Sequence, residues 1–78
     1  MTSTDIAHRV DARGLSCPLP IVRTAMAVKD LPSGTLVEVL ATDPGSQKDF
    51  MAWARTTGHR LLHSSEADGV YRFVLVRK

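Results

Sequence analysis

The spacing of apolar residues changes along the chain and divides it into segments of two kinds. Between residues 35 and 41, apolar side chains alternate so that Val37, Val39 and Ala41 share one face, as in a strand with one covered side. Between residues 18 and 30, apolar residues recur at a helical spacing. We expect strands at 8–11, 35–41, 60–64 and 70–77, a helix at 18–30 and a second helix between residue 46 and Gly58.

Turn-forming residues mark the ends of these segments. Pro18 and Pro20 fit the first and third positions of a helix, because the amides that proline lacks have no intrahelical partner there. This places Cys17 at the N-cap. Pro32 cannot continue the helix, and Asp68-Gly69 is a favoured two-residue turn that predicts a hairpin between the last two strands.

The resulting order of elements is β-α-β-α-β-β. Helical crossovers join parallel strands and the final hairpin joins antiparallel ones, so the four-stranded sheet must be mixed. Two helices cannot cover both faces of such a sheet at this length. We therefore expect an α/β (α+β) two-layer sandwich with both helices on one face. The expected core residues are Ile21, Val22, Ala25, Val37, Val39, Phe50, Trp53, Ala54 and Phe73.

The length of 78 residues predicts a single domain, 1–78, with residues 1–7 as a flexible N-terminal segment. Nearly every apolar face must be buried to offset the ordering of the chain, which leaves little material for an enclosed substrate cavity. The sequence has no glycine-rich nucleotide-binding loop and no Cys-x-x-Cys pair. We expect surface chemistry on a substrate brought by another molecule, without ATP, a metal or a cofactor.

Charge and cysteine usage favour a cytoplasmic protein. Ten basic and eight acidic residues give a net charge of +2, and they form no basic run, so we do not expect nucleic acid as a partner. The single cysteine can form no internal disulfide, which fits a reducing compartment. A secretory signal and an apolar stretch of about 20 residues are both missing, so we expect no membrane contact. The default oligomeric state is a monomer.

Cys17 is the strongest candidate for chemistry. A lone cysteine is more often a small buried hydrophobe, but this one precedes a proline-rich helix start, where side chains tend to project toward solvent. The positive end of the helix dipole favours a thiolate there, so we expect a lowered thiol pKa. The two nearby prolines stiffen the helix start, which would hold a reactive sulfur in place without a pocket.

The other titratable residues are weaker candidates. His59 and His63 lie at the start of a predicted strand, where four residues span about 13 Å, so one metal ion cannot bind both. We interpret them, like His8, as solvated surface groups. Asp43 is interpreted as a turn residue, and Ser46 and Asp43 are the candidate caps of the second helix. Asp49 is interpreted as a first-turn residue that complements the dipole of this helix, and Asp43, Glu38 and Asp49 do not form a convincing catalytic carboxylate pair.

Several motifs, taken in their order along the chain, resemble those of a known family. The most specific is Asp11-x-x-Gly14-Leu15-x-Cys17-Pro18-x-Pro20. It is followed by Gly34, by Thr42-Asp43-Pro44-Gly45-Ser46-x-x-Asp49 and by Thr57-Gly58-His59. This pattern, which extends from about His8 to Lys78, resembles the TusA/SirA family of sulfur carriers.

The resemblance implies a two-layer β-α-β-α-β-β sandwich whose cysteine, here Cys17, carries sulfane sulfur as a persulfide. Family members receive sulfur from a cysteine desulfurase or a rhodanese-like protein. They pass it to the Tus relay of tRNA thiolation, to molybdenum-cofactor work or, in sulfur-oxidising bacteria, to DsrE-type partners. Leu19 occupies a variable motif position, where some tRNA-pathway members have an acidic residue, and this favours the sulfur-oxidation setting.

We therefore hypothesise a sulfurtransferase that accepts sulfur on Cys17 and hands it to an acceptor protein. Gly14, Pro18 and Pro20 would shape the site. Arg13, Leu19 and Arg23, close in sequence to Cys17, are candidate partner-binding residues. Two alternatives stay open at this point: a non-enzymatic RNA- or protein-binding module, and a regulatory thiol that reacts with oxidants but retains no transferable sulfur.

Overall fold

A computed structural model describes residues 6–78 and contains the elements in the predicted order. They are β1 (His8–Ala12), α1 (Leu19–Val28), β2 (Leu36–Ala41), α2 (Ser46–Thr57), β3 (Arg60–Ala67) and β4 (Val70–Val76). Most of the segment expected to be flexible, 1–7, lies outside the described residues. Within them, the amide of Ala7 donates a hydrogen bond of 3.0 Å to the carbonyl of Leu36.

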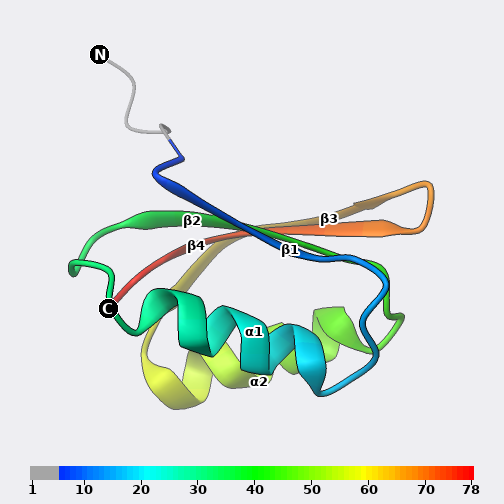
Figure 1. Cartoon of the computed structure of the whole chain (residues 1–78), viewed down its shortest axis with the longest axis horizontal. Coiled ribbons are helices and arrows are strands. Elements are labelled where there is room, and N and C mark those ends of the chain that lie inside the picture. The colour runs from blue at the N-terminus through cyan, green and yellow to red at the C-terminus, as the bar shows by residue number, and fades with distance from the viewer. Residues whose placement is uncertain (1–5) are drawn as a thin grey trace.

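The strands form one mixed sheet in the order β1-β2-β4-β3. β1 pairs with β2 in parallel, and β4 is antiparallel to both of its neighbours. Figure 1 shows both helices packed side by side on one face of this sheet. The predicted two-layer sandwich is therefore confirmed. No helix within residues 6–78 is both long enough and apolar enough to cross a membrane.

The parallel pairing of β1 and β2 decides where the two helices begin. Parallel strands have their carboxyl ends at the same edge of a sheet. The loops that lead from β1 into α1 and from β2 into α2 therefore leave from one edge, at the right of Figure 1. The N-terminal ends of both helices meet there, and with them the segments 13–18 and 42–46.

The core lies between the sheet and the helices. Val37, Val39 and Phe73 point toward the helices and are fully buried. Phe50 of α2 stacks on Phe73 of β4, with ring centroids 4.5 Å apart. Trp53 meets Phe50 edge to face at 6.0 Å and completes an aromatic contact that anchors α2 to the sheet.

The buried side of α1 differs from the predicted one. Val22, expected in the core, is 45% exposed, and Ala25 is only half-buried. The buried positions are instead Pro20, Thr24 and Val28, which recur at every fourth residue. A polar residue can occupy this side because the Thr24 hydroxyl donates to the Pro20 carbonyl at 2.8 Å.

Glycine supplies the left-handed backbone that two chain reversals need. The hairpin between β3 and β4 turns through Asp68 and Gly69, both at positive φ (54° and 80°), as the Asp-Gly pair predicts. α2 ends at Gly58, where φ is 85° and the amide donates to the Ala54 carbonyl. β3 extends to Ala67, three residues beyond the predicted end.

The uncovered face of the sheet is crossed by an ion-pair network centred on β2. Glu38 accepts hydrogen bonds from Arg9 of β1 at 2.9 Å and from Arg72 of β4 at 2.5 Å. The Glu38 side chain is only 12% exposed. The hydrogen bond from Arg72, followed by the charges of both arginines, lowers the pKa of the Glu38 carboxyl.

Two matched substitutions on α1 test the corrected orientation of this helix. Val28→Ala should lower the free energy of unfolding by about 1.5–2 kcal/mol, because buried apolar groups are lost. Val22→Ala should change it by about 0.5 kcal/mol or less, because that side chain is exposed. Urea titrations of both variants provide the measurement, and equal losses would contradict the observed face.

The Glu38 network should also make stability depend on pH. Because the folded-state pKa of Glu38 is lowered, its contribution is present above the ordinary glutamate value of 4.5 and is lost as the pH falls through the folded value. We expect Glu38→Gln to cost about 0.5–1 kcal/mol at neutral pH. Urea titrations of the variant and the wild type should be run at neutral pH and in acid, below the folded-state pKa of Glu38. The difference in the free energy of unfolding should shrink in acid, and a difference independent of pH would argue against this role.

Candidate functional site

Cys17 lies in the loop before α1 and is exposed. The helix begins at Leu19 with Pro18 at the N-cap, so Pro20 is its second residue. The predicted assignment of Pro18 and Pro20 to the first and third helical positions, with Cys17 at the N-cap, is therefore wrong by one residue. Cys17 is outside the helix, and the Leu19 amide donates to the Ser16 carbonyl at 2.8 Å.

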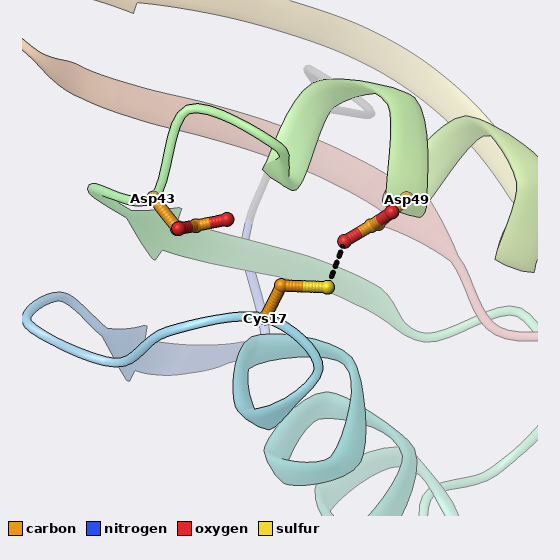
Figure 2. Close-up of side chains that lie close together, drawn as sticks. All are labelled: Cys17, Asp43 and Asp49. Atoms are coloured by element: carbon orange, nitrogen blue, oxygen red, sulfur yellow. Dashed lines mark hydrogen bonds between the residues drawn. The ribbon is translucent and has the colours of Figure 1, made fainter.

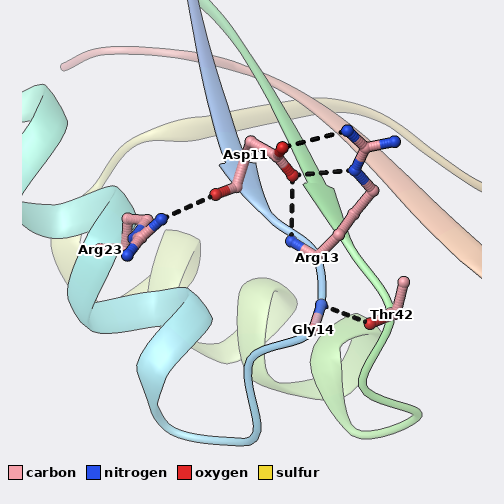
Figure 3. A network of polar contacts seen from close by, with 5 residues as sticks. All are labelled: Asp11, Arg13, Gly14, Arg23 and Thr42. Atoms are coloured by element: carbon pink, nitrogen blue, oxygen red, sulfur yellow. Dashed lines mark hydrogen bonds and ion pairs between the residues drawn. The ribbon is translucent and has the colours of Figure 1, made fainter.

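The loop that carries Cys17 is tied to its neighbours at both ends. The Gly14 amide donates to the Thr42 hydroxyl at 2.8 Å, which joins this loop to the one before α2 (Figure 3). Gly14 has a φ of 80°, where a side chain would be strained. At the other end Pro20, in the first turn of α1, is fully buried. The segment between them therefore presents Cys17 from two fixed points.

Two carboxylates from the facing loop and helix approach the sulfur. The Cys17 Sγ donates a hydrogen bond of 2.7 Å to Oδ2 of Asp49, which lies in the first turn of α2 (Figure 2). Asp43 lies beside them in the loop between β2 and α2, and its Oδ2 accepts a hydrogen bond from the Gly45 amide at 3.1 Å. The Cys17 Sγ and one carboxylate oxygen from each of Asp43 and Asp49 all lie within 4.8 Å of one another.

This arrangement overturns the expected electrostatics of the thiol. The hydrogen bond to Asp49, with partial desolvation and the negative charges of Asp49 and Asp43, raises the pKa of Cys17 above its ordinary value. The prediction of a lowered pKa is wrong for a physical reason. It counted only the dipole of α1, whereas two full negative charges arrive from α2 and its preceding loop.

Asp49 is the site residue that the sequence analysis missed. It was interpreted as a partner for the dipole of α2, and its position in the first turn is confirmed. Its meeting with Cys17 depends on the sheet. Two successive β-α units with a parallel pair imply that both helix starts share one edge, and this was the available signal.

The helix start of α2 is also different in detail. Ser46 and Asp43 were considered as caps, but Gly45 is the N-cap and Ser46 is the first helical residue. The Ser46 amide donates to the Asp43 carbonyl at 3.0 Å. The Ser46 side chain is buried and its hydroxyl has no partner among the described residues.

Arg13 and Arg23 gather around Asp11 rather than around the sulfur (Figure 3). The Arg13 guanidinium donates to both carboxylate oxygens of Asp11, at 2.9 and 3.0 Å. Arg23 donates to the Asp11 carbonyl at 3.1 Å. The hydrogen bonds from Arg13 hold the pKa of Asp11 at about 2.

The exposed side of α1 that begins next to Cys17 is apolar. Leu19, Val22 and Met26 of α1 are 50%, 45% and 70% exposed, and their spacing puts them on one side of the helix. An open hollow of about 270 Å³ is lined by Pro44 of the preceding loop and by Gln47, Lys48 and Met51 of α2. Such a shallow feature does not enclose a small-molecule substrate.

The described histidines lie away from this edge. His59 packs on Trp53, with ring centroids 5.0 Å apart, and its Nδ1 accepts from the Lys78 amide at 2.9 Å. Burial, followed by the charges of Arg77 and Lys78, lowers the pKa of His59. His59 is therefore half-buried rather than a fully solvated surface group. His63 is exposed on β3.

The geometry agrees with the comparisons to known proteins. A family model described as Sulfurtransferase TusA matches residues 8–77. A sulfur carrier protein TusA from Allochromatium vinosum is 45% identical over 71 residues, which cover 91% of this chain and 93% of that protein. A putative sulfur carrier protein from Neisseria meningitidis is 48% identical over 72 residues, covering 92% and 97%.

A solved structure supports the same relationship. The crystal structure of a SirA-like protein from Desulfitobacterium hafniense superimposes with a TM-score of 0.78 at 30% identity. The match covers 88% of this chain and 95% of that one. The resemblance inferred from the motifs around Cys17 is therefore confirmed.

Removing Arg13 should release the Asp11 carboxyl. In Arg13→Ala, the pKa of Asp11 should rise from about 2 toward its ordinary value of 3.8, because the strongest hydrogen bonds to the carboxylate are lost. An NMR titration of the Asp11 carboxyl carbon measures this. Arg23→Ala is the control and should shift the value less, since Arg23 bonds the backbone carbonyl. Equal shifts would contradict the geometry.

Proposed function

The chain belongs to the TusA family of sulfur carrier proteins, and on that premise we propose that it accepts sulfane sulfur as a persulfide on Cys17 and hands it to an acceptor protein. The observation that carries the proposal is the exposed Cys17 sulfur at the edge where both helices begin. A sulfur in this position is open to a visiting cysteine from another protein.

Each transfer is an exchange at sulfur and needs no external oxidant. The Cys17 sulfur attacks the outer sulfur of a donor persulfide, and the donor's S–S bond breaks with both electrons left on the donor cysteine. Cys17 then carries the outer sulfur. In delivery, an acceptor thiolate attacks that sulfur and Cys17 is the leaving group, so the carrier returns to its thiol.

The hollow at the start of α2 is open, so the partners must supply the enclosure around the reacting sulfurs. The exposed apolar side of α1, with Leu19, Val22 and Met26, begins two residues from Cys17 and supports docking by another protein. We propose Leu19, Arg13 and Arg23 as partner-binding residues. For the two arginines, the docked surface would meet guanidinium groups already oriented by Asp11.

Three further residues would shape the site. Gly14 permits the left-handed turn and the hydrogen bond to Thr42, while Pro20 is buried in the first turn of α1 and Pro18 is its N-cap. Together they limit the conformations of the segment that holds Cys17. Order of this kind reduces the entropy lost when a partner aligns two sulfurs.

The proposed relay has a donor and an acceptor of defined chemistry. We propose a cysteine desulfurase or a rhodanese-like protein as donor, and a DsrE-type protein or a Tus relay component as acceptor. The protein would act as a sulfurtransferase in the cytoplasm, as a monomer, in sulfur oxidation and trafficking or in tRNA thiolation. Direct membrane or nucleic-acid contact is not part of the proposal.

Mass spectrometry of the intact protein tests the carrier function. After incubation with a cysteine desulfurase and cysteine, or with excess polysulfide, the wild type should gain the mass of one sulfur atom. Cys17→Ser should gain none, because the accepting sulfur is replaced by a hydroxyl. The added sulfur should disappear when a thiol acceptor is supplied, since an outer persulfide sulfur is transferable.

Two results would contradict the function. An unchanged mass of the wild type would exclude persulfide formation, and equal gain by Cys17→Ser would place the sulfur elsewhere. Oxidation of Cys17 to a sulfenic acid with no transferable sulfur would instead support a regulatory thiol.

A further inference from the structure

We infer that Asp49 controls the reactivity of Cys17: its carboxylate keeps the thiol hydrogen on the sulfur and makes transfer depend on a docking partner that brings positive charge. The inference deepens the proposed carrier function and rests on it for its biological meaning. It assigns a role to a residue of α2 that lies 32 positions from the cysteine in sequence.

The first support is that the contact joins two well-anchored groups. Asp49 precedes Phe50, which is fully buried and stacked on Phe73, so packing sets the first turn of α2. Cys17 stands three residues before the buried Pro20. Both side chains are short, and the 2.7 Å hydrogen bond therefore orders few rotatable bonds. It is a property of the fold's geometry rather than a chance meeting of long surface groups.

The second support is the sign of the charge around the sulfur. Asp49 from α2 and Asp43 from the preceding loop face it, and Lys48 lies beside Asp49 on the hollow of α2. On the cysteine's own side, Arg13 and Arg23 are hydrogen-bonded to Asp11. The charged groups closest to the sulfur are thus the two carboxylates, which disfavour a thiolate.

The consequence for loading follows from thiol chemistry. Only the thiolate is an effective nucleophile, so the hydrogen bond keeps unloaded Cys17 unreactive. When the donor persulfide reacts, a bond forms between the Cys17 Sγ and the donor's outer sulfur, and the donor's S–S bond breaks. The proton that leaves Cys17 is accepted first by the Asp49 carboxylate and ends on the departing donor thiolate. Two thiol-level sulfurs and one sulfane sulfur are present before and after, so the exchange is balanced.

The consequence for partner choice is electrostatic. A lysine or arginine that a docked protein places against Asp43 and Asp49 compensates their charge and permits the thiolate to form. Anionic sulfur compounds free in solution are repelled by the same carboxylates. The site therefore favours sulfur presented on a protein with a basic surface over small sulfur anions.

Alkylation of Cys17 by iodoacetamide tests the control of the thiol. In Asp49→Asn the rate near neutral pH should rise about threefold and the pH profile should move to lower values, in the range typical of one exposed charge interaction. Asp49→Glu should restore a slow rate by returning the negative charge. Asp30→Asn is the matched control, since Asp30 is an exposed carboxylate beyond the far end of α1.

Reagent charge gives a second reading that a purely structural role would not change. Relative to a small neutral thiol such as 2-mercaptoethanol, wild-type Cys17 should show a severalfold greater preference for a cationic trimethylammonium methanethiosulfonate over an anionic sulfonate analogue at low salt. In the double variant Asp43→Asn, Asp49→Asn, the preference should fall toward the ratio that the small thiol gives with the same two reagents. Thermal melting of each variant confirms that the fold is retained.

The inference is overturned if Asp49→Asn leaves the alkylation profile unchanged, or if the double variant keeps the wild-type preference between the charged reagents. Neither measurement requires a sulfur donor. A wild type that gains no sulfur would therefore remove the carrier function while the alkylation results stand, and a normal gain of sulfur with unchanged alkylation would remove only the role of Asp49.

Discussion

The parallel pairing of β1 with β2 is the constraint on which the site depends. It brings the ends of two strands to one edge and so makes neighbours of two helix starts that are far apart in sequence. Pro20 in the first turn of α1 and Phe50 near the start of α2 are both fully buried, and their burial fixes the two helix starts. The meeting of Cys17 with Asp49 is the chemical result of this backbone arrangement.

A carrier of sulfur faces opposing demands, and the geometry addresses both. The sulfur must be open enough for another protein's cysteine to reach, yet an open thiolate also reacts with oxidants and stray electrophiles. In the proposed function, the exposure of Cys17 would meet the first demand, and its hydrogen bond to Asp49 would meet the second. Selectivity would then arise in the encounter between proteins, which is consistent with the open hollow at the start of α2.

Local signals in the sequence were enough for the order of elements, because two-residue and helical periodicities and the Asp68-Gly69 turn act over short distances. They failed on α1, where Thr24 is buried and Val22 exposed, because the burial of a hydroxyl depends on its bond to the Pro20 carbonyl. Cys17 could be singled out from its prolines alone. The sign of its pKa shift could not, because the carboxylate of Asp49 arrives through the tertiary fold.

The adjacency of Asp49 and Phe50 links two parts of the molecule that are usually treated separately. One residue touches the sulfur and the next fills the centre of the aromatic contact with β4. Any repacking that rotates the first turn of α2 must also move the carboxylate, so damage to the interior is transmitted to the surface. The rate at which a reagent labels Cys17 therefore reports how well the interior around Phe50 is packed.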